Sequence, residues 1–553
     1  MAVKAISADK ALEAIEAHDH ESPDPTIDYG EGDTHRIPHT QRGIKSRHAQ
    51  MLAIGGTIGT GLFVGVGSAL SIAGPAFLLL SYALICLLVY AVITATTEMN
   101  TYLPAHGCSM AAYATRFVSP SLGFSLGLLY WYSFGILVAY ETTAAAVVIN
   151  YWSNPVPLAV WITLMLLVVF ALNFSPVRIY GETEFWFASL KVFLILGLLI
   201  LSFILFWGGG PSHTRLGFHY WNHPGATNTY LVPGAAGRFC AFIYTLCYSV
   251  FSFNFGPELL VVAAGEMQNP RANLPRAARQ FFYRLLVFYV LGVLAIGVIC
   301  PSNASGLTTG TGVNASPWVI AIKHAGISGL DSVVNAVIIT SAWSAANSYL
   351  YMSSRTLYSL AAAGSAPPIF GRCNRHGVPY YAVLASASFG GLAYMDCSAG
   401  ASTVFNWFVS LTNSAGMISW TACAVVYLRF RGACAVQGVG VPYRSCWQPY
   451  GAWAAMVVCP VILLGQGFQY FVAGNWSVSG FLTSYIGAFV FLGVYAVRRG
   501  LGAWRWGEGW WLSAHEVDLR SGLEEVEALE LVVECEGEGG GGRKGRWWER
   551  VWG

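Results

Sequence analysis

The chain has 553 residues, of which 55% are hydrophobic and only 10% are Asp, Glu, Lys or Arg. Soluble domains carry about 25% charged residues, so this composition excludes a string of ordinary water-soluble domains and indicates one polytopic membrane protein. The formal net charge of +2 gives no reason to expect a nucleic acid partner.

The first 48 residues are polar and rich in acidic side chains, and we expect residues 1–48 to form a disordered cytosolic tail. They lack the basic and then apolar pattern of a cleavable signal peptide. The 12 cysteines are scattered, without a CxxC pair or a Cys/His cluster at zinc spacing. We therefore expect neither a metal site nor a cofactor.

Apolar runs of about 20 residues, the length that crosses a bilayer core, recur after this tail. Together they define a transmembrane domain over residues 49–499, followed by a low-complexity cytosolic tail over 500–553. The predicted fold is an all-α polytopic membrane protein with about 12 spans, at 49–72, 75–98, 121–150, 157–173, 185–207, 239–264, 281–300, 331–361, 380–395, 404–428, 450–473 and 477–497.

Lys and Arg residues are distributed unevenly between alternate loops. If the N-terminus is cytosolic, the inner loops and span ends carry 17 of them, whereas the outer loops carry three, Arg215, Arg238 and Lys323. Because basic residues are retained on the cytosolic side of membranes, this asymmetry predicts that both termini are cytosolic.

The first span contains the stretch GGTIGTG at residues 55–61. Each glycine in a helix interior costs about 1 kcal/mol relative to alanine. Close helix packing of the small-xxx-small kind is one explanation, and it suits Gly65 and Gly67 best. The other is an unwound backbone, whose free N–H groups, together with the hydroxyls of Thr57 and Thr60, would bind a carboxylate at the start of the next half-helix.

The sixth span carries a comparable interruption in the sequence FSFNFGPE, where Gly256 and Pro257 both disfavour a continuous helix. Two interrupted spans at matching positions of two five-helix halves indicate a transporter binding site. Freed carbonyls and a nearby carboxylate would suit an ammonium group, so the two breaks together describe a pocket for a zwitterion. Phe251, Phe253 and Phe255 could line it, or they could simply pack.

Three ionisable residues lie inside predicted spans: Glu141 in the third, Lys191 in the fifth and Glu258 in the sixth. Such groups are costly in a bilayer and are functional candidates by default. The alternative for each is a structural pair, and for Lys191 also a side chain that reaches back to the interface.

Four stretches resemble signatures of the fungal amino acid permeases, within the amino acid–polyamine–organocation superfamily. The resemblance extends from about residue 42 to residue 499 and rests on RHAQMLAIGGTIGTGLFVGVGSAL (47–70), GPELLVVAAGEMQNPRANLPRA (256–277), SAANSYLYMSSRTLYSLA (344–361) and FRGACAVQGVGVPYRSCWQPYGAW (430–453).

The resemblance implies a five-plus-five inverted repeat with broken helices 1 and 6, two further C-terminal helices, and proton-coupled amino acid import across the plasma membrane. By the same resemblance, Thr57, Gly59, Thr60 and Gly61 would bind the substrate carboxylate and Glu141 would take part in recognition. The pocket would be lined by Phe253, Phe255, Gly256 and Glu258. Lys191 matches a fifth-helix lysine that takes the place of a sodium ion in proton-coupled relatives, and it is the proton-coupling candidate. Protonation of Lys191, Glu141 or Glu258 would supply the coupling.

The sequence leaves other functions open. A non-transporting amino acid sensor would keep the same pocket, and a transporter of a polyamine, choline or a nucleobase would leave the carboxylate donors unused. We find no HExxH, GxSxG or paired-aspartate motif in the spans, so we expect no enzyme activity. Expected partners are the amino acid, the proton and the lipid bilayer, with ubiquitin-ligase adaptors acting on tail lysines such as Lys4, Lys10 and Lys45.

Overall fold

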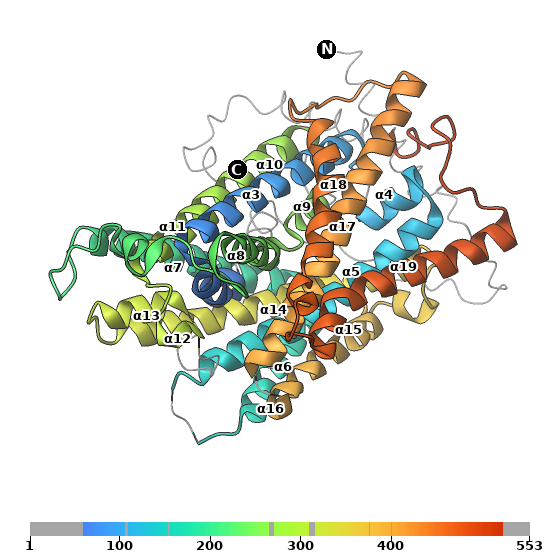
Figure 1. The fold of residues 1–553 in the computed structure, drawn as a ribbon. Helices are drawn as coiled ribbons and strands as arrows, with labels where there is room; N and C mark the ends of the chain where they lie inside the picture. The colour runs from blue at the N-terminus through green and yellow to red at the C-terminus, as the bar shows by residue number, and fades with distance from the viewer. Residues whose placement is uncertain are drawn as a thin grey trace, which may run out of the picture.

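The architecture comes from a computed structural model, which describes residues 59–104, 109–152, 155–264, 270–308, 316–374, 377–399 and 401–523. Every regular element in these ranges is a helix (Figure 1). The predicted N-terminal tail and Thr57 lie outside the described residues.

Each of the twelve predicted spans is largely helical in the described residues, with interior non-helical residues at 254–255 in the sixth span and at 466–467 in the eleventh. The first half of the molecule comprises η1 (Gly61–Gly65), α3 (Val66–Tyr102), α4 (Met110–Phe117), α5 (Pro120–Ile149), α6 (Leu158–Phe174), α7 (Val177–Phe206), η2 (Trp221–Gly225), α8 (Gly234–Ser249), η3 (Val250–Phe253) and α9 (Gly256–Ala264). The second half comprises α10 (Pro270–Leu285), η4 (Leu286–Val290), α11 (Leu291–Ile299), α12 (Ser305–Thr308), α13 (Pro317–His324), α14 (Leu330–Ala362), η5 (Pro368–Gly371), α15 (Tyr380–Ala387), η6 (Ser388–Met395), α16 (Asp396–Ala399), α17 (Ala401–Gln437), α18 (Tyr450–Gly465), η7 (Phe468–Phe471) and α19 (Val478–Trp506).

Seven helical segments of the described chain are long and apolar enough to cross a membrane. One of them, Gly61–Tyr102, has 42 residues and would measure about 63 Å, twice the thickness of a bilayer core. It is kinked at Gly74, whose φ of 78° and ψ of 171° are not helical, and Pro75 follows directly. This segment therefore accounts for the first two predicted spans.

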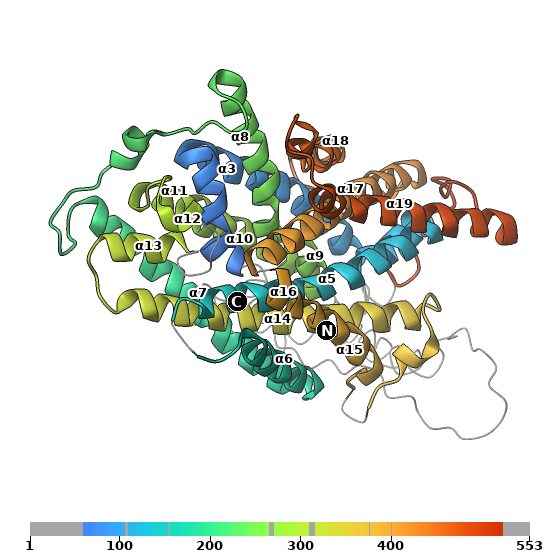
Figure 2. The ribbon, with the colours of Figure 1, turned by 60° about the horizontal axis from the view of Figure 1, so that its bottom comes forward.

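Helix α14 is the long helix that hydropathy alone identifies least well. It runs beside α5 in both views (Figures 1 and 2), and it buries polar side chains rather than presenting apolar ones to lipid. Those side chains include Ser341, Ser344, Asn347, Ser348, Ser353 and Ser354. A central position in the bundle explains its lower hydropathy, because its polar groups are enclosed by other helices.

The outer surface of the bundle is apolar. Large hydrophobic side chains on α7, α18 and α19 are mostly exposed, for example Phe193 at 72% and Leu464 at 71%. Such an apolar surface would be a liability in water, but it is what a helix facing hydrocarbon presents.

Residues 507–523, which follow α19, pack back onto the ends of four helices. Leu519 and Val517 are 1% and 3% exposed, and the Tyr102 hydroxyl donates to the Leu519 carbonyl at 2.9 Å. Arg116 pairs with the Asp518 carboxylate at 3.2 Å, and the side chain of Gln437 donates to the Val517 carbonyl at 2.8 Å. We call residues 507–523 the C-terminal strap. The remainder of the predicted tail lies outside the described residues.

Candidate functional site

The sixth span is interrupted between η3 and α9, as the sequence predicts. Asn254 has a ψ of 134°, and Phe255 has a φ of 56°, a conformation that side chains other than glycine rarely adopt. The break precedes Gly256 and Pro257, which begin α9, where a proline in the first turn removes no intrahelical hydrogen bond.

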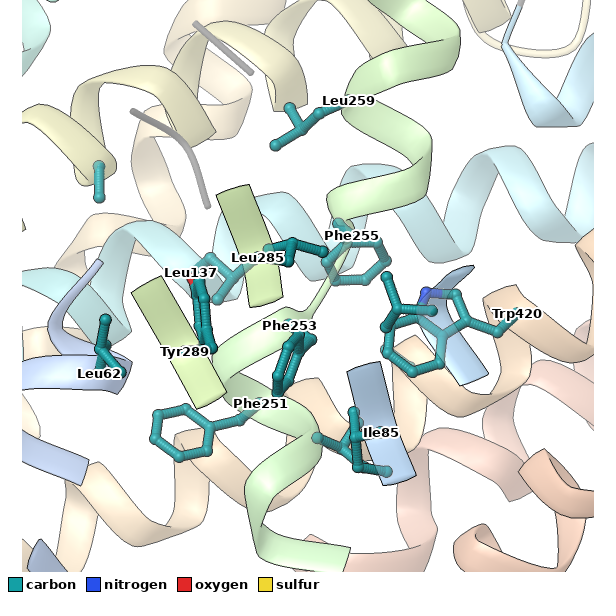
Figure 3. Close-up of a cluster of buried hydrophobic side chains, with 14 of the residues drawn as sticks. Leu62, Ile85, Leu137, Phe251, Phe253, Phe255, Leu259, Leu285, Tyr289 and Trp420 are labelled. Carbon is teal, nitrogen blue, oxygen red and sulfur yellow. The ribbon is translucent and has the colours of Figure 1, made fainter. Parts of the chain in front are cut away.

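Aromatic rings enclose this break (Figure 3). The ring of Phe253 lies 4.6 Å from that of Tyr289 and 5.5 Å from that of Tyr82, measured between centroids. The ring of Phe255 lies 5.0 Å from that of Phe134 on α5. Phe253 and Phe255 are 1% and 0% exposed, so in this conformation both side chains pack in the core beside the break.

The glycines of the first span allow it to approach the sixth at the break. A Cβ atom on Gly65 would lie 2.1 Å from the Phe251 ring, and one on Gly61 would lie 3.2 Å from the Ser252 Cα atom. Gly65 therefore has the packing role that the sequence suggests. Gly61, predicted to bind substrate, also lies in close contact with the sixth span.

Glu141 lies against the first span. Its side chain is 2% exposed, and Thr60 donates a hydrogen bond from Oγ1 to Glu141 Oε2 at 2.9 Å. A Cβ atom on Gly59 would lie 2.5 Å from Glu141 Oε1. The structure thus brings together Gly59, Thr60 and Glu141, which the sequence placed about 80 residues apart on different helices.

Lys191 is 1% exposed within α7 and interacts electrostatically with two carboxylates, Glu141 on α5 and Glu184 on its own helix. Glu184 is 2% exposed. Its Oε1 and Oε2 atoms accept from the Ser344 hydroxyl of α14 at 2.9 and 3.0 Å. The three charged groups form one buried cluster, which we call the acid–lysine cluster: Glu141, Glu184 and Lys191.

Glu184 is absent from the sequence-based predictions because the fifth span was predicted to begin at residue 185. The helix in fact begins at Val177. The signal that could have identified Glu184 is its spacing of seven residues from Lys191, which places both side chains on one face of a helix.

Glu258 does not join this cluster. It is 3% exposed and accepts a hydrogen bond from Ser419 of α17, whose hydroxyl also contacts that of Tyr130 at 2.8 Å. Tyr130 precedes Glu141 by 11 residues on α5, a distance of about 16 Å along the helix axis. Glu258 therefore belongs to a separate polar contact between α5, α9 and α17.

A polar cavity of about 330 Å³ lies beside η3, between α8, α17 and the α18–α19 connection. Asn413 lines it and reaches the break, because it donates to the Cys247 carbonyl at 3.1 Å and accepts from Asn254 at 3.4 Å. Other lining residues are Tyr248, Asn406, Gln466 and Gln469. In the described ranges, no three His, Cys, Asp or Glu side chains gather in a way that could hold a metal ion.

Comparison with known proteins gives matches over nearly the whole chain. Residues 48–499 match the profile of the amino acid permease family. A proline-specific permease of Emericella nidulans is 46% identical over 543 residues, covering 96% of this chain and 97% of that protein. A proline-specific permease of Saccharomyces cerevisiae is 43% identical over 521 residues, covering 92% and 82%, respectively. A dicarboxylic amino acid permease of the same yeast is 41% identical over 463 residues, covering 82% and 76%.

Among solved structures, the fold is similar to that of a manganese transporter from Eremococcus coleocola, with a TM-score of 0.51 and 13% sequence identity. The match covers 86% of this chain and 98% of that one. At this identity the likeness concerns the fold alone, that of a helical membrane transporter.

Proposed function

Because the chain belongs to the amino acid permease family, whose curated members similar to it are fungal amino acid permeases, we propose that it imports an amino acid across the plasma membrane by proton symport. The transport unit is the domain over residues 49–499, and both termini face the cytosol. Lysines of the cytosolic tails are the sites at which ubiquitin-ligase adaptors would act.

The observation that carries this proposal is the position of Glu141. Its carboxylate is buried against Gly59 and Thr60 of the first span and interacts with Lys191. A buried carboxylate at an interrupted span suits a substrate ammonium group. The backbone N–H groups of Thr57, Gly59, Thr60 and Gly61 then bind the substrate carboxylate.

Alternating access follows from the packing of the two interrupted spans. Gly61 and Gly65 hold the first span against Phe251 and Ser252 of the sixth, so the two spans move together. Rocking of this pair against α5 and α14 exposes the site to each side of the membrane in turn. Gly256 and Glu258 belong to the sixth-span half that moves, and Phe253 and Phe255 leave their packed positions when substrate enters.

Proline is the first substrate to test. The two relatives with 46% and 43% identity are named proline-specific permeases, whereas a lysine-specific permease of Saccharomyces cerevisiae is 39% identical. The phenylalanine and tyrosine rings around the break, once substrate separates them, would suit the apolar pyrrolidine ring of proline better than a charged side chain.

Uptake of labelled proline in yeast cells that lack their own proline transport tests the proposal. We expect accumulation, competition by proline analogues that retain the carboxylate, and no competition by pyrrolidine, which lacks it. Binding without accumulation would indicate a sensor. Equal competition by pyrrolidine would exclude the carboxylate site and favour a cation carrier.

The variant Glu141→Gln tests whether Glu141 takes part in transport or only supports the fold. We expect it to lower uptake by about tenfold or more at matched amounts of protein in the plasma membrane, since hydrogen bonds to charged groups contribute about 1.5–3 kcal/mol. Unchanged uptake at matched surface amounts would make Glu141 a structural residue.

A further inference from the structure

We propose that Glu184 carries the coupled proton and is the cytosolic member of the acid–lysine cluster. This inference rests on the proposed proton symport and identifies a residue for it. The geometry of α7, the charges of the cluster and the hydrogen bonds from α14 each contribute to the argument.

The spacing on α7 directs Lys191 toward Glu184. Seven residues correspond to a rise of about 10 Å and a rotation of about 20° from alignment. Long side chains on a helix point back toward its N-terminus, so the Lys191 ammonium extends toward Glu184. Both residues are buried, and Lys191 interacts with Glu184 and with Glu141.

The net charge of the acid–lysine cluster favours the binding of one proton. Two carboxylates and one ammonium carry a net charge of −1 when all are ionised, which is costly in a low-dielectric interior. A zwitterionic substrate adds no net charge. One bound proton therefore makes the loaded site neutral, whereas the empty site without the proton carries −1. An inside-negative membrane potential favours the return of the empty, negatively charged site to the outside.

The contacts of the two carboxylates indicate which one takes the proton. Glu141 accepts from the Thr60 hydroxyl, and in the proposed site it also faces the substrate ammonium, which favours its ionised form. Glu184 lies away from the first span, and its hydroxyl partners on α14 are Ser344, at 2.9 and 3.0 Å, and Ser348. A hydroxyl can accept as well as donate, so the hydroxyl contacts of both carboxylates suit either protonation state, and Lys191 interacts with both. The difference between them is the substrate ammonium, which keeps Glu141 ionised and leaves Glu184 to take the proton.

Polar groups continue from Glu184 toward the end of α7 that is cytosolic in the proposed orientation. The described titratable groups that interact with it are Lys191 on the same helix and Tyr349 on α14, with Glu141 on α5 beyond Lys191. A buried amide pair continues the polar contacts, since Asn173 at the end of α6 donates to Asn347 of α14 at 2.8 Å. In the proposed orientation Asn173 and Asn347 lie between the acid–lysine cluster and the cytosol.

The test uses the purified full-length protein in liposomes, with labelled proline as the probe. Two measurements are made on the wild type, Glu184→Gln and Glu182→Gln: exchange of internal for external proline, and accumulation driven by an imposed pH gradient. Glu182 is the matched control because it is a half-buried glutamate two residues away on the same helix.

A gradient of about two pH units supports accumulation of up to about 100-fold by a one-proton symporter, because each unit is a factor of ten. We expect the wild type and Glu182→Gln to accumulate proline, and Glu184→Gln to exchange it but to reach only equal concentrations on both sides. Accumulation by Glu184→Gln equal to that of Glu182→Gln would overturn the inference. If the wild type itself shows no pH-driven accumulation, the proposed symport fails instead.

If Glu184→Gln loses exchange as well, Ser344→Ala decides the question, because it keeps the carboxyl group and removes one of its two hydroxyl partners, leaving Ser348. We then expect exchange to persist and the pH dependence of accumulation to shift relative to the wild type. An unshifted profile would assign Glu184 a structural role.

Discussion

The hydroxyl of Thr60 links the first span to Glu141, and a matched pair of variants tests it. Thr60→Ala removes the donor at 2.9 Å, whereas Thr60→Ser keeps it. Because a hydrogen bond to a charged group contributes about 1.5–3 kcal/mol, we expect Thr60→Ala to raise the KM for uptake about tenfold or more. Thr60→Ser is expected to stay within about twofold of the wild type, well under 1 kcal/mol. Equal KM values for the two variants would show that this contact does not support binding.

At the same scale, the sequence was sufficient to select Glu141 and Lys191, because an ionisable residue deep in an apolar run is conspicuous. For Glu184, which lies in the polar stretch GETE and resembles a loop residue, the sequence offers only the spacing of seven residues from Lys191. Burial of Glu184 depends on α14, whose Ser344 supplies its hydrogen bonds. A contact between residues 160 positions apart cannot be predicted from the local amino-acid composition.

At the scale of elements, the apposition of the first and sixth spans is tested at Gly65. Its Cβ atom would lie 2.1 Å from the Phe251 ring, so Gly65→Ala should lower the thermal unfolding temperature of the detergent-solubilised protein. Overpacking typically costs about 1–3 kcal/mol. We expect partial recovery in the double variant with Phe251→Leu, which removes the ring.

Gly197→Ala on α7 is the control for this experiment, since nothing lies within 4 Å of a Cβ atom there. An unfolding temperature for Gly65→Ala equal to that of Gly197→Ala would contradict close packing between the two spans. A double variant no more stable than Gly65→Ala would show that Phe251 is not the residue that clashes.

The C-terminal strap is a second element whose attachment can be measured. Leu519 is 1% exposed, and its neighbour Arg520 is exposed. Burying a leucine side chain contributes about 1.5–3 kcal/mol, so Leu519→Asp should release the strap and hasten its cleavage by an added protease. Arg520→Asp should leave the cleavage rate unchanged. Equal rates for both variants would mean that the strap does not depend on this contact.

The spans themselves were predictable because bilayer thickness fixes their length and apolar character. The local geometry of the breaks was not. Gly256 and Pro257 identify an interruption, yet the residue with a positive φ is Phe255. Its ring packs against Phe134 of α5, a tertiary contact that the local sequence does not encode. The strap was likewise unpredictable, since Val517 and Leu519 are two apolar residues in a polar stretch.

At the scale of the whole molecule, composition determines which surfaces meet lipid. Polar side chains gather on α14 in the interior, while α7, α18 and α19 expose phenylalanine, leucine and valine. The interior is still mostly apolar, so the difference from a soluble bundle lies in the apolar outer surface, which needs few of the charged side chains that this chain lacks. The uneven distribution of basic residues between alternate predicted loops predicts the orientation.

Two exposed cysteines in the described part of the chain test that orientation directly. Cys397 lies in α16, in a predicted outer loop, and Cys446 lies in the predicted inner loop between α17 and α18. A membrane-impermeant maleimide should label Cys397 in intact cells and should reach Cys446 only after permeabilisation. Cys397→Ser is therefore expected to reduce labelling of intact cells, and Cys446→Ser to reduce only the labelling that permeabilisation adds. The opposite labelling pattern would mean that the protein has the inverted orientation in the membrane. The end of α7 that carries Glu184 would then face the outside, where Glu184 could not release a proton to the cytosol.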